Sequence, residues 1–194
     1  MALAAEGFSC KVYPTHNHVD QERQILQFLL KSPLRALIVE PVKSALPSPN
    51  TELYQRLIQR GTSILFLGCA YPQLSHDSSI YEDNLYGAVL LVQKSCGKKA
   101  TLLSPVISRL DDQRGLERYQ GFLDAMQNQG LTVPDSNICW YTTQELDDFR
   151  QSQDISFLKK FLERITPDCT AFICEDDFIA WLLWKSCRLD RRKR

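Results

Sequence analysis

The sequence predicts an α/β protein with parallel sheets, and three observations support this class. Short apolar runs typical of strands alternate with helix-like segments along most of the chain. Strands that are separated by helices form right-handed βαβ units, which give parallel sheets. Some runs, such as residues 36–39, contain no polar residue, as is typical of strands covered on both faces. With 194 residues, the chain has room for one domain or two small lobes.

Each predicted strand is a short run of apolar residues, and each predicted helix repeats its apolar residues at a spacing of three or four. The first helix shows this spacing with Ile25, Leu26, Phe28 and Leu29. In chain order, the predicted strands are residues 9–13, 36–40, 63–67, 80–81, 99–104, 137–141 and 170–174. The predicted helices are residues 21–31, 52–60, 86–95, 115–129, 155–165 and 178–186.

The helix over residues 115–129 has the most informative start. Arg118 lies three residues before Gly121-Phe122, and Phe122, Ala125 and Met126 follow at helical spacing. The helix therefore buries one face and presents Arg118 near its first turn, after the carboxyl end of a strand. Ligands of open α/β sheets bind at this edge. The alternative is that Arg118 is a solvated charge on the helix.

Polar and aromatic side chains recur after the predicted strands, and this predicts a ligand site. Carboxylates, Arg or Lys side chains and aromatic faces are groups that bind a small polar ligand. Several of these side chains could instead cap a helix or order a loop. Arg118 and Asp177 are the first choices. The predicted ligand-binding residues are Arg118, Asp177, Lys43, Tyr141, Glu40, Asp83, Asp111, Tyr71 and His16.

Several strings resemble the sugar-sensing domain of the lactose-repressor and galactose-repressor family. The Arg-x-x-Gly-Phe string at Arg118 matches the family's helix start, and Asp83-Asn84 followed by Gly87 matches its acidic turn. Asp176-Asp177 matches its Asn-Asp signature, with Asp in place of Asn. The string Val-Glu-Pro-Val-Lys-Ser-Ala-Leu-Pro over residues 39–47 resembles the arabinose-repressor branch. The resemblance extends over roughly residues 7 to 187.

The resemblance implies a two-lobed, type I periplasmic-binding-protein-like fold built on doubly wound parallel sheets. It implies a sugar-sensing effector domain that binds a small sugar, with L-arabinose as the first candidate. In this family, sugar binding between two lobes changes their closure and the DNA affinity of the intact dimer. DNA is bound there by a separate module. We expect a homodimer, or a heterodimer with an intact regulator, and DNA binding only through a module absent from this chain.

By the same resemblance, the fold should be incomplete at both ends. The expected lobes are residues 7–97, without the family's first strand, and residues 98–187, without its last strands, followed by a basic tail at residues 188–194. The missing first strand would leave unpaired backbone groups inside the first sheet. We therefore expect a marginally stable isolated chain, oligomeric or protected from hydrogen exchange only around residues 99 to 186.

Composition narrows the function classes. The 23 basic and 23 acidic residues cancel, so the chain lacks the positive surface typical of nucleic-acid binding. Its seven cysteines form no Cys-x-x-Cys pair, and their odd number predicts neither a disulfide framework nor a zinc site. Scattered free thiols favour a reducing cytoplasm. No signal peptide is recognisable, and no apolar run approaches the roughly 20 residues of a membrane span.

No motif predicts catalysis, a metal or a cofactor. The chain lacks a glycine-rich phosphate loop and a Gly-x-Ser-x-Gly elbow. The pair His16-x-His18 stands alone, which favours a polar loop over a metal site. Two alternatives remain: a non-binding remnant that only dimerises with an intact regulator, and a small α/β enzyme. Titration with pentoses separates the remnant from the sensor.

Overall fold

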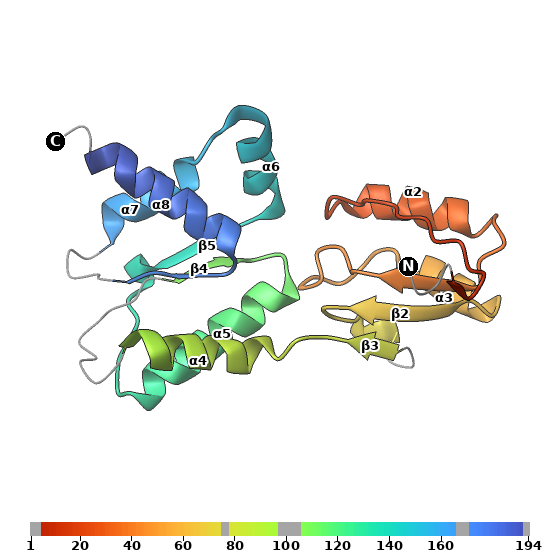
Figure 1. The fold of residues 1–194 in the computed structure, drawn as a ribbon, viewed down its shortest axis with the longest axis horizontal. Helices are drawn as coiled ribbons and strands as arrows, with labels where there is room; N and C mark the ends of the chain where they lie inside the picture. Colours follow the sequence, from red (N-terminus) through yellow and green to blue (C-terminus); the bar gives the residue numbers. More distant parts are fainter. Residues whose placement is uncertain (1–4, 75–77, 97–105, 166–170, 192–194) are drawn as a thin grey trace. The chain divides into compact units, whose positions relative to one another are not determined.

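The chain forms two compact units, which are described separately (Figure 1). The structure, a computed structural model, describes residues 5–74, 78–96, 106–165 and 171–191. The first unit comprises Met1–Lys43 and Pro47–Ile80, and the second comprises Ser44–Leu46 and Tyr81–Arg194. Both units are α/β with parallel strands, as the sequence predicts.

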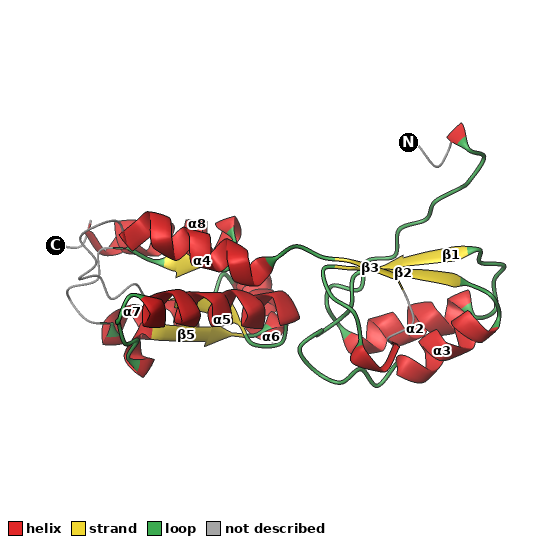
Figure 2. Ribbon diagram, turned by 90° about the horizontal axis from the view of Figure 1, so that it is seen from below, coloured by secondary structure: helices red, strands yellow, loops and turns green. Residues whose placement is uncertain are grey.

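The first unit is a three-stranded parallel sheet in the order β1-β2-β3. Figure 2 shows its two helices on the same face of this sheet. Three aromatic rings, those of Tyr54, Phe66 and Tyr71, meet in the core with centroids 5.8 to 6.0 Å apart. The elements are α2 (Val19–Leu29), β1 (Ala36–Val39), α3 (Thr51–Gln59), β2 (Ser63–Leu67) and β3 (Ser78–Ile80).

Residues 9–13 form no strand, so this prediction is wrong. The apolar side chains of the segment are exposed, and Val12 is 92% accessible to solvent. A segment forms a β-strand only when its backbone hydrogen-bonds to a neighbouring strand. β1 pairs with β2 on one side, and no described segment pairs with its other side. Ile38 of β1 is 56% exposed.

The second unit has the strand order β5-β4-β6, with helices on both faces. In Figure 1, α4 and α5 lie side by side below the strands, and α7 and α8 lie above them. Two separate buried clusters, around Ile107 with Leu158 and around Phe122 with Val92, correspond to these faces. The elements are α4 (Asn84–Cys96), β4 (Val106–Arg109), α5 (Gln113–Asn128), β5 (Ile138–Tyr141), α6 (Thr143–Ser152), α7 (Ser156–Arg164), β6 (Ile173–Cys174) and α8 (Asp177–Arg191).

In the second unit, one predicted strand has no described counterpart and one helix was not predicted. The predicted strand over residues 99–104 lies outside the described residues, and the strand that carries the site is β4. α6 was not predicted, although Thr142 and Glu145 form a capping box at its start. The predicted lobes of residues 7–97 and 98–187 also differ from the two units. α4 packs along α5 and therefore lies in the second unit.

Candidate ligand-binding site

The carboxyl ends of the three strands of the second unit bring polar side chains together. Arg109 ends β4 and Tyr141 ends β5, and the two residues are partners in the parallel register. Glu175 directly follows β6, and its backbone N–H donates to the carbonyl of Ile107 in β4. These three residues form one cluster at the edge of the sheet where ligands of α/β proteins bind.

Glu175 lies at the centre of this cluster. Its Oε2 accepts hydrogen bonds from the backbone N–H of Arg109 at 2.6 Å and from the Tyr141 hydroxyl at 2.8 Å. Its Oε1 lies 3.6 Å from the Arg109 guanidinium. Burial raises the pKa of the Glu175 carboxyl above its usual value, although Arg109 and Tyr141 act in the opposite direction. Burial and the Glu175 carboxylate also raise the pKa of Tyr141, so its hydroxyl remains a donor.

Arg118 lies in the first half of α5, and two hydrogen bonds hold its side chain. Its Nε donates to Oδ1 of Asn84 at 2.9 Å, and its Nη1 donates to the backbone carbonyl of Glu175 at 2.6 Å. Asn84 is buried at the first residue of α4. The guanidinium is therefore fixed from α4 and from the end of β6, and neither bond uses Nη2.

The sequence around Gly115 explains why α5 begins so close to β4. A Cβ at Gly115 would lie 3.1 Å from the backbone nitrogen of Arg109 and 3.2 Å from its carbonyl carbon. Only glycine permits this approach without a shift. The Ser108 hydroxyl donates to the Gly115 carbonyl at 2.7 Å. This tight turn places the first turns of α5 beside the end of β4.

Asp112 caps α5 and joins the charged cluster. Its side chain accepts from the backbone N–H of Arg114 at 2.9 Å and forms ion pairs with Arg109 at 2.6 Å and Arg114 at 3.1 Å. Burial alone would raise the pKa of Asp112. The hydrogen bonds and charges of Arg114 and Arg109 outweigh burial and hold this pKa below its usual value.

Three other predicted residues form hydrogen bonds within the protein, and a fourth is the first residue of a helix. The Asp111 carboxylate accepts from the backbone and hydroxyl of Thr143 at the start of α6. The Asp83 carboxylate accepts from the Tyr86 N–H in the first turn of α4. The Tyr71 ring is buried, and its hydroxyl donates to the Val42 carbonyl at 2.9 Å. Asp177 is exposed as the first residue of α8.

The remaining predicted residues lie in two loops of the first unit. Glu40 follows β1 and is exposed, and Lys43 lies three residues further on. The backbone N–H of Lys43 donates to Oδ1 of Asn17 at 2.7 Å, so the loop of His16 is tied to the loop of Lys43. His16, Asn17 and Lys43 have φ values of 49°, 61° and 45°. Such strained non-glycine backbone is enriched at functional sites.

Arg118 and Tyr141 thus both donate hydrogen bonds to Glu175. In the first unit, the Asn17 side chain links the loop of His16 to the loop of Lys43. Glu175 and Arg109 were not among the predicted residues, although the position of Glu175 directly after a predicted strand was a usable signal. Tyr141 was expected to offer an aromatic face, but its ring packs 5.6 Å from that of Phe157 and is 1% exposed.

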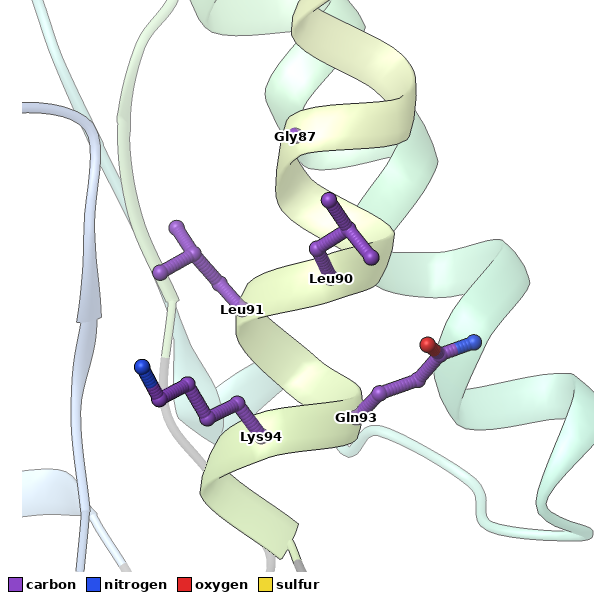
Figure 3. Close-up of a pocket in the computed structure, with 5 residues that line it drawn as sticks. All are labelled: Gly87, Leu90, Leu91, Gln93 and Lys94. Atoms are coloured by element: carbon purple, nitrogen blue, oxygen red, sulfur yellow. The ribbon is translucent and has the colours of Figure 1, made fainter.

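A separate hollow of about 680 Å³ lies on the outer face of α4. Figure 3 shows Leu90 and Leu91 projecting from the helix there, with Lys94 on the same side as Leu91. Its lining includes no carboxylate and no aromatic ring, so it lacks groups that are expected of a sugar site. Its lining residues are Gly87, Leu90, Leu91, Gln93 and Lys94.

Among the residues that the structure describes, no group of three or more His, Cys, Asp or Glu side chains is arranged to hold a metal ion. No helix among the described residues has the length and apolar character needed to cross a membrane.

Two curated proteins are similar in sequence over most of the chain. The arabinose metabolism transcriptional repressor of Geobacillus stearothermophilus is 26% identical over 190 residues, which are 96% of this chain and 50% of the repressor. The protein of the same name from Halalkalibacterium halodurans is 24% identical over 178 residues, 92% of this chain and 46% of the repressor. The chain therefore spans about half the length of these relatives. No family model matches the chain.

Solved structures share the fold. The myo-inositol binding protein of Caulobacter superposes with a TM-score of 0.73 and 15% identity, over 96% of this chain and 61% of that protein. A LacI family transcriptional regulator from Silicibacter pomeroyi superposes with a TM-score of 0.68 and 18% identity, over 95% of this chain and 66% of the regulator. By their names, these proteins are two transcriptional repressors, a transcriptional regulator and a myo-inositol binding protein.

The chain is therefore related in sequence to arabinose metabolism transcriptional repressors and has the type I periplasmic-binding-protein-like fold of LacI-family regulators and sugar-binding proteins.

Proposed function

We propose that the chain is a sugar-sensing effector domain of a cytoplasmic transcriptional regulator of the arabinose-repressor type. Its ligand is a small sugar, and L-arabinose is the first candidate. The observation that carries this proposal is Arg118: two hydrogen bonds fix its guanidinium at the carboxyl edge of a parallel sheet and leave Nη2 for a ligand. A preorganised, charged donor is suited to sugar hydroxyls because it loses little side-chain entropy on binding.

Each unit contains further predicted ligand-binding residues. Asp177 offers an exposed carboxylate two residues after Glu175. In the first unit, His16 and Lys43 lie in two loops of strained backbone, which the Asn17 side chain links, and the Lys43 loop follows β1. In the intact regulator, sugar binding changes the affinity for DNA, provided that the sugar binds one conformation more tightly than another. DNA binding itself requires a module outside this chain.

Titration calorimetry with L-arabinose and other pentoses tests the proposal. We expect heat of binding from the chain, and a loss of about 1.5 to 3 kcal/mol in Arg118→Ala, the range for hydrogen bonds to charged groups. Arg150→Ala is the matched control, because Arg150 is 58% exposed and pairs only with Asp147 on α6 among the described residues. Equal affinity of a folded Arg118→Ala variant would reject the assignment.

A second function is a non-binding remnant that only dimerises with an intact regulator. The structural use of Tyr71, Tyr141, Asp83 and Asp111 favours it, because their contacts leave fewer groups for a sugar. In that case, no pentose produces heat, while the chain still forms mixed dimers with an intact regulator. Size-exclusion chromatography of the mixture measures this directly.

A further inference from the structure

Glu175 forms hydrogen bonds to residues of three elements of the second unit, β4, β5 and α5. Its carboxylate binds the main chain at the end of β4 and the hydroxyl at the end of β5. Its own backbone carbonyl receives Nη1 of Arg118 from α5. A shift of Glu175 therefore moves one of the two groups that hold the Arg118 guanidinium.

The surroundings of the Glu175 carboxylate make its charge important. The side chain is 3% exposed, and a buried carboxylate is costly unless it is paired and hydrogen-bonded. The positive partner is Arg109, which also pairs with Asp112. Tyr141 donates to the carboxylate from β5, and Asp176 is the next residue in the chain. Removal of Glu175 would leave Arg109 with one carboxylate in place of two.

We propose that Glu175 is a positioning residue for sugar binding, which acts by holding the ends of β4 and β5 and thereby the Arg118 guanidinium. This inference rests on the proposed sugar-binding function. Glu175 does not bind the sugar itself, because its side chain is 3% exposed and its Oε2 accepts from two protein groups. The specificity of the site then depends on a residue that the arabinose-repressor resemblance did not point to.

Two substitutions separate the charge of Glu175 from its hydrogen bonds. In Glu175→Gln, the amide oxygen can replace Oε2 and accept from Arg109 and Tyr141. The NH₂ group then faces the Arg109 guanidinium, and because both groups are donors, no hydrogen bond or ion pair forms between them. In Glu175→Ala, both hydrogen bonds and the ion pair are lost. Glu163→Gln is the matched control, since Glu163 is exposed on α7.

The experiment combines L-arabinose titration with the NMR signal of the Arg118 Nε–H group. We expect affinity to fall about tenfold or more in Glu175→Ala, less in Glu175→Gln, and not at all in Glu163→Gln, with tenfold equal to about 1.4 kcal/mol. The Arg118 Nε–H signal should shift and exchange faster with solvent in both Glu175 variants. A loss of stability alone would leave that signal in place below the melting temperature.

Other outcomes overturn the inference. If folded Glu175→Ala and Glu175→Gln bind as the unaltered chain does, or leave the Arg118 signal unmoved, Glu175 has no positioning role. If Glu175→Ala does not fold, Tyr141→Phe replaces it, because this change removes one contact of Glu175 and keeps the ring. Unchanged affinity in Tyr141→Phe and Glu175→Gln then rejects the inference. If the unaltered chain binds no pentose, the proposed function fails first, and the positioning role fails with it.

Discussion

Replacement of Gly121 by alanine tests the packing of α4 against α5, on which the position of Arg118 depends. A Cβ at Gly121 would lie 2.9 Å from the carbonyl carbon of Leu85 and 3.0 Å from its Cα. These are backbone atoms, so no flexible side chain can move aside. Overpacking of this kind costs about 1 to 3 kcal/mol. Alanine recovers up to about 1 kcal/mol of helix propensity, so we expect a net loss of about 1 to 2 kcal/mol.

Gly87→Ala is the matched control, because it is also a helical Gly-to-Ala change but has no atom within 4 Å of the added Cβ. It should stabilise the second unit by about 0.5 to 1 kcal/mol. Urea unfolding followed by tryptophan fluorescence measures both variants, since Trp140, Trp181 and Trp184 all belong to the second unit. The Gly121→Ala midpoint should fall by roughly 0.3 to 2 M urea, for slopes of about 1 to 3 kcal/mol per molar. A midpoint equal to or above that of the unaltered chain would refute the packing argument.

Three further predictions concern thiols, acid stability and DNA. Burial raises the pKa of Cys139 and Cys174 to about 12, so alkylation at pH 8 should label exposed Cys10 first; equal rates in the folded chain would contradict this burial. The pKa of Asp112 is held below its usual 3.8 in the folded chain. The Asp112 carboxylate therefore contributes stability above pH 3.8, and this stability is lost as the pH falls through the lowered pKa. Asp112→Asn should therefore lose stability near neutral pH and lose little in acid, as acid and urea unfolding can measure. The chain alone should not bind operator DNA specifically, because its charges cancel; sequence-specific retention in a mobility-shift assay at physiological salt would show otherwise.

Patterns that depend on neighbouring residues could be read directly from the sequence. The α/β class and all six predicted helices are confirmed to within a few residues, because apolar spacing is a local property of the chain. The placement of Arg118 beside the carboxyl edge of a sheet followed from the same spacing. The helix α6 could also have been found from Thr142 and Glu145, whose capping box is a sequence signal.

Only the tertiary structure decided which of the polar residues face one another and which apolar segments become strands. Residues 9–13 have strand-like composition, but no described segment supplies the hydrogen-bonded neighbour that a strand requires. The Glu175 carboxylate meets Arg109 and Tyr141, which are 66 and 34 residues away in sequence. The same contact engages the hydroxyl of Tyr141, a residue predicted to bind the ligand. Such partners are fixed by the register of parallel strands, and no local pattern in the sequence records that register.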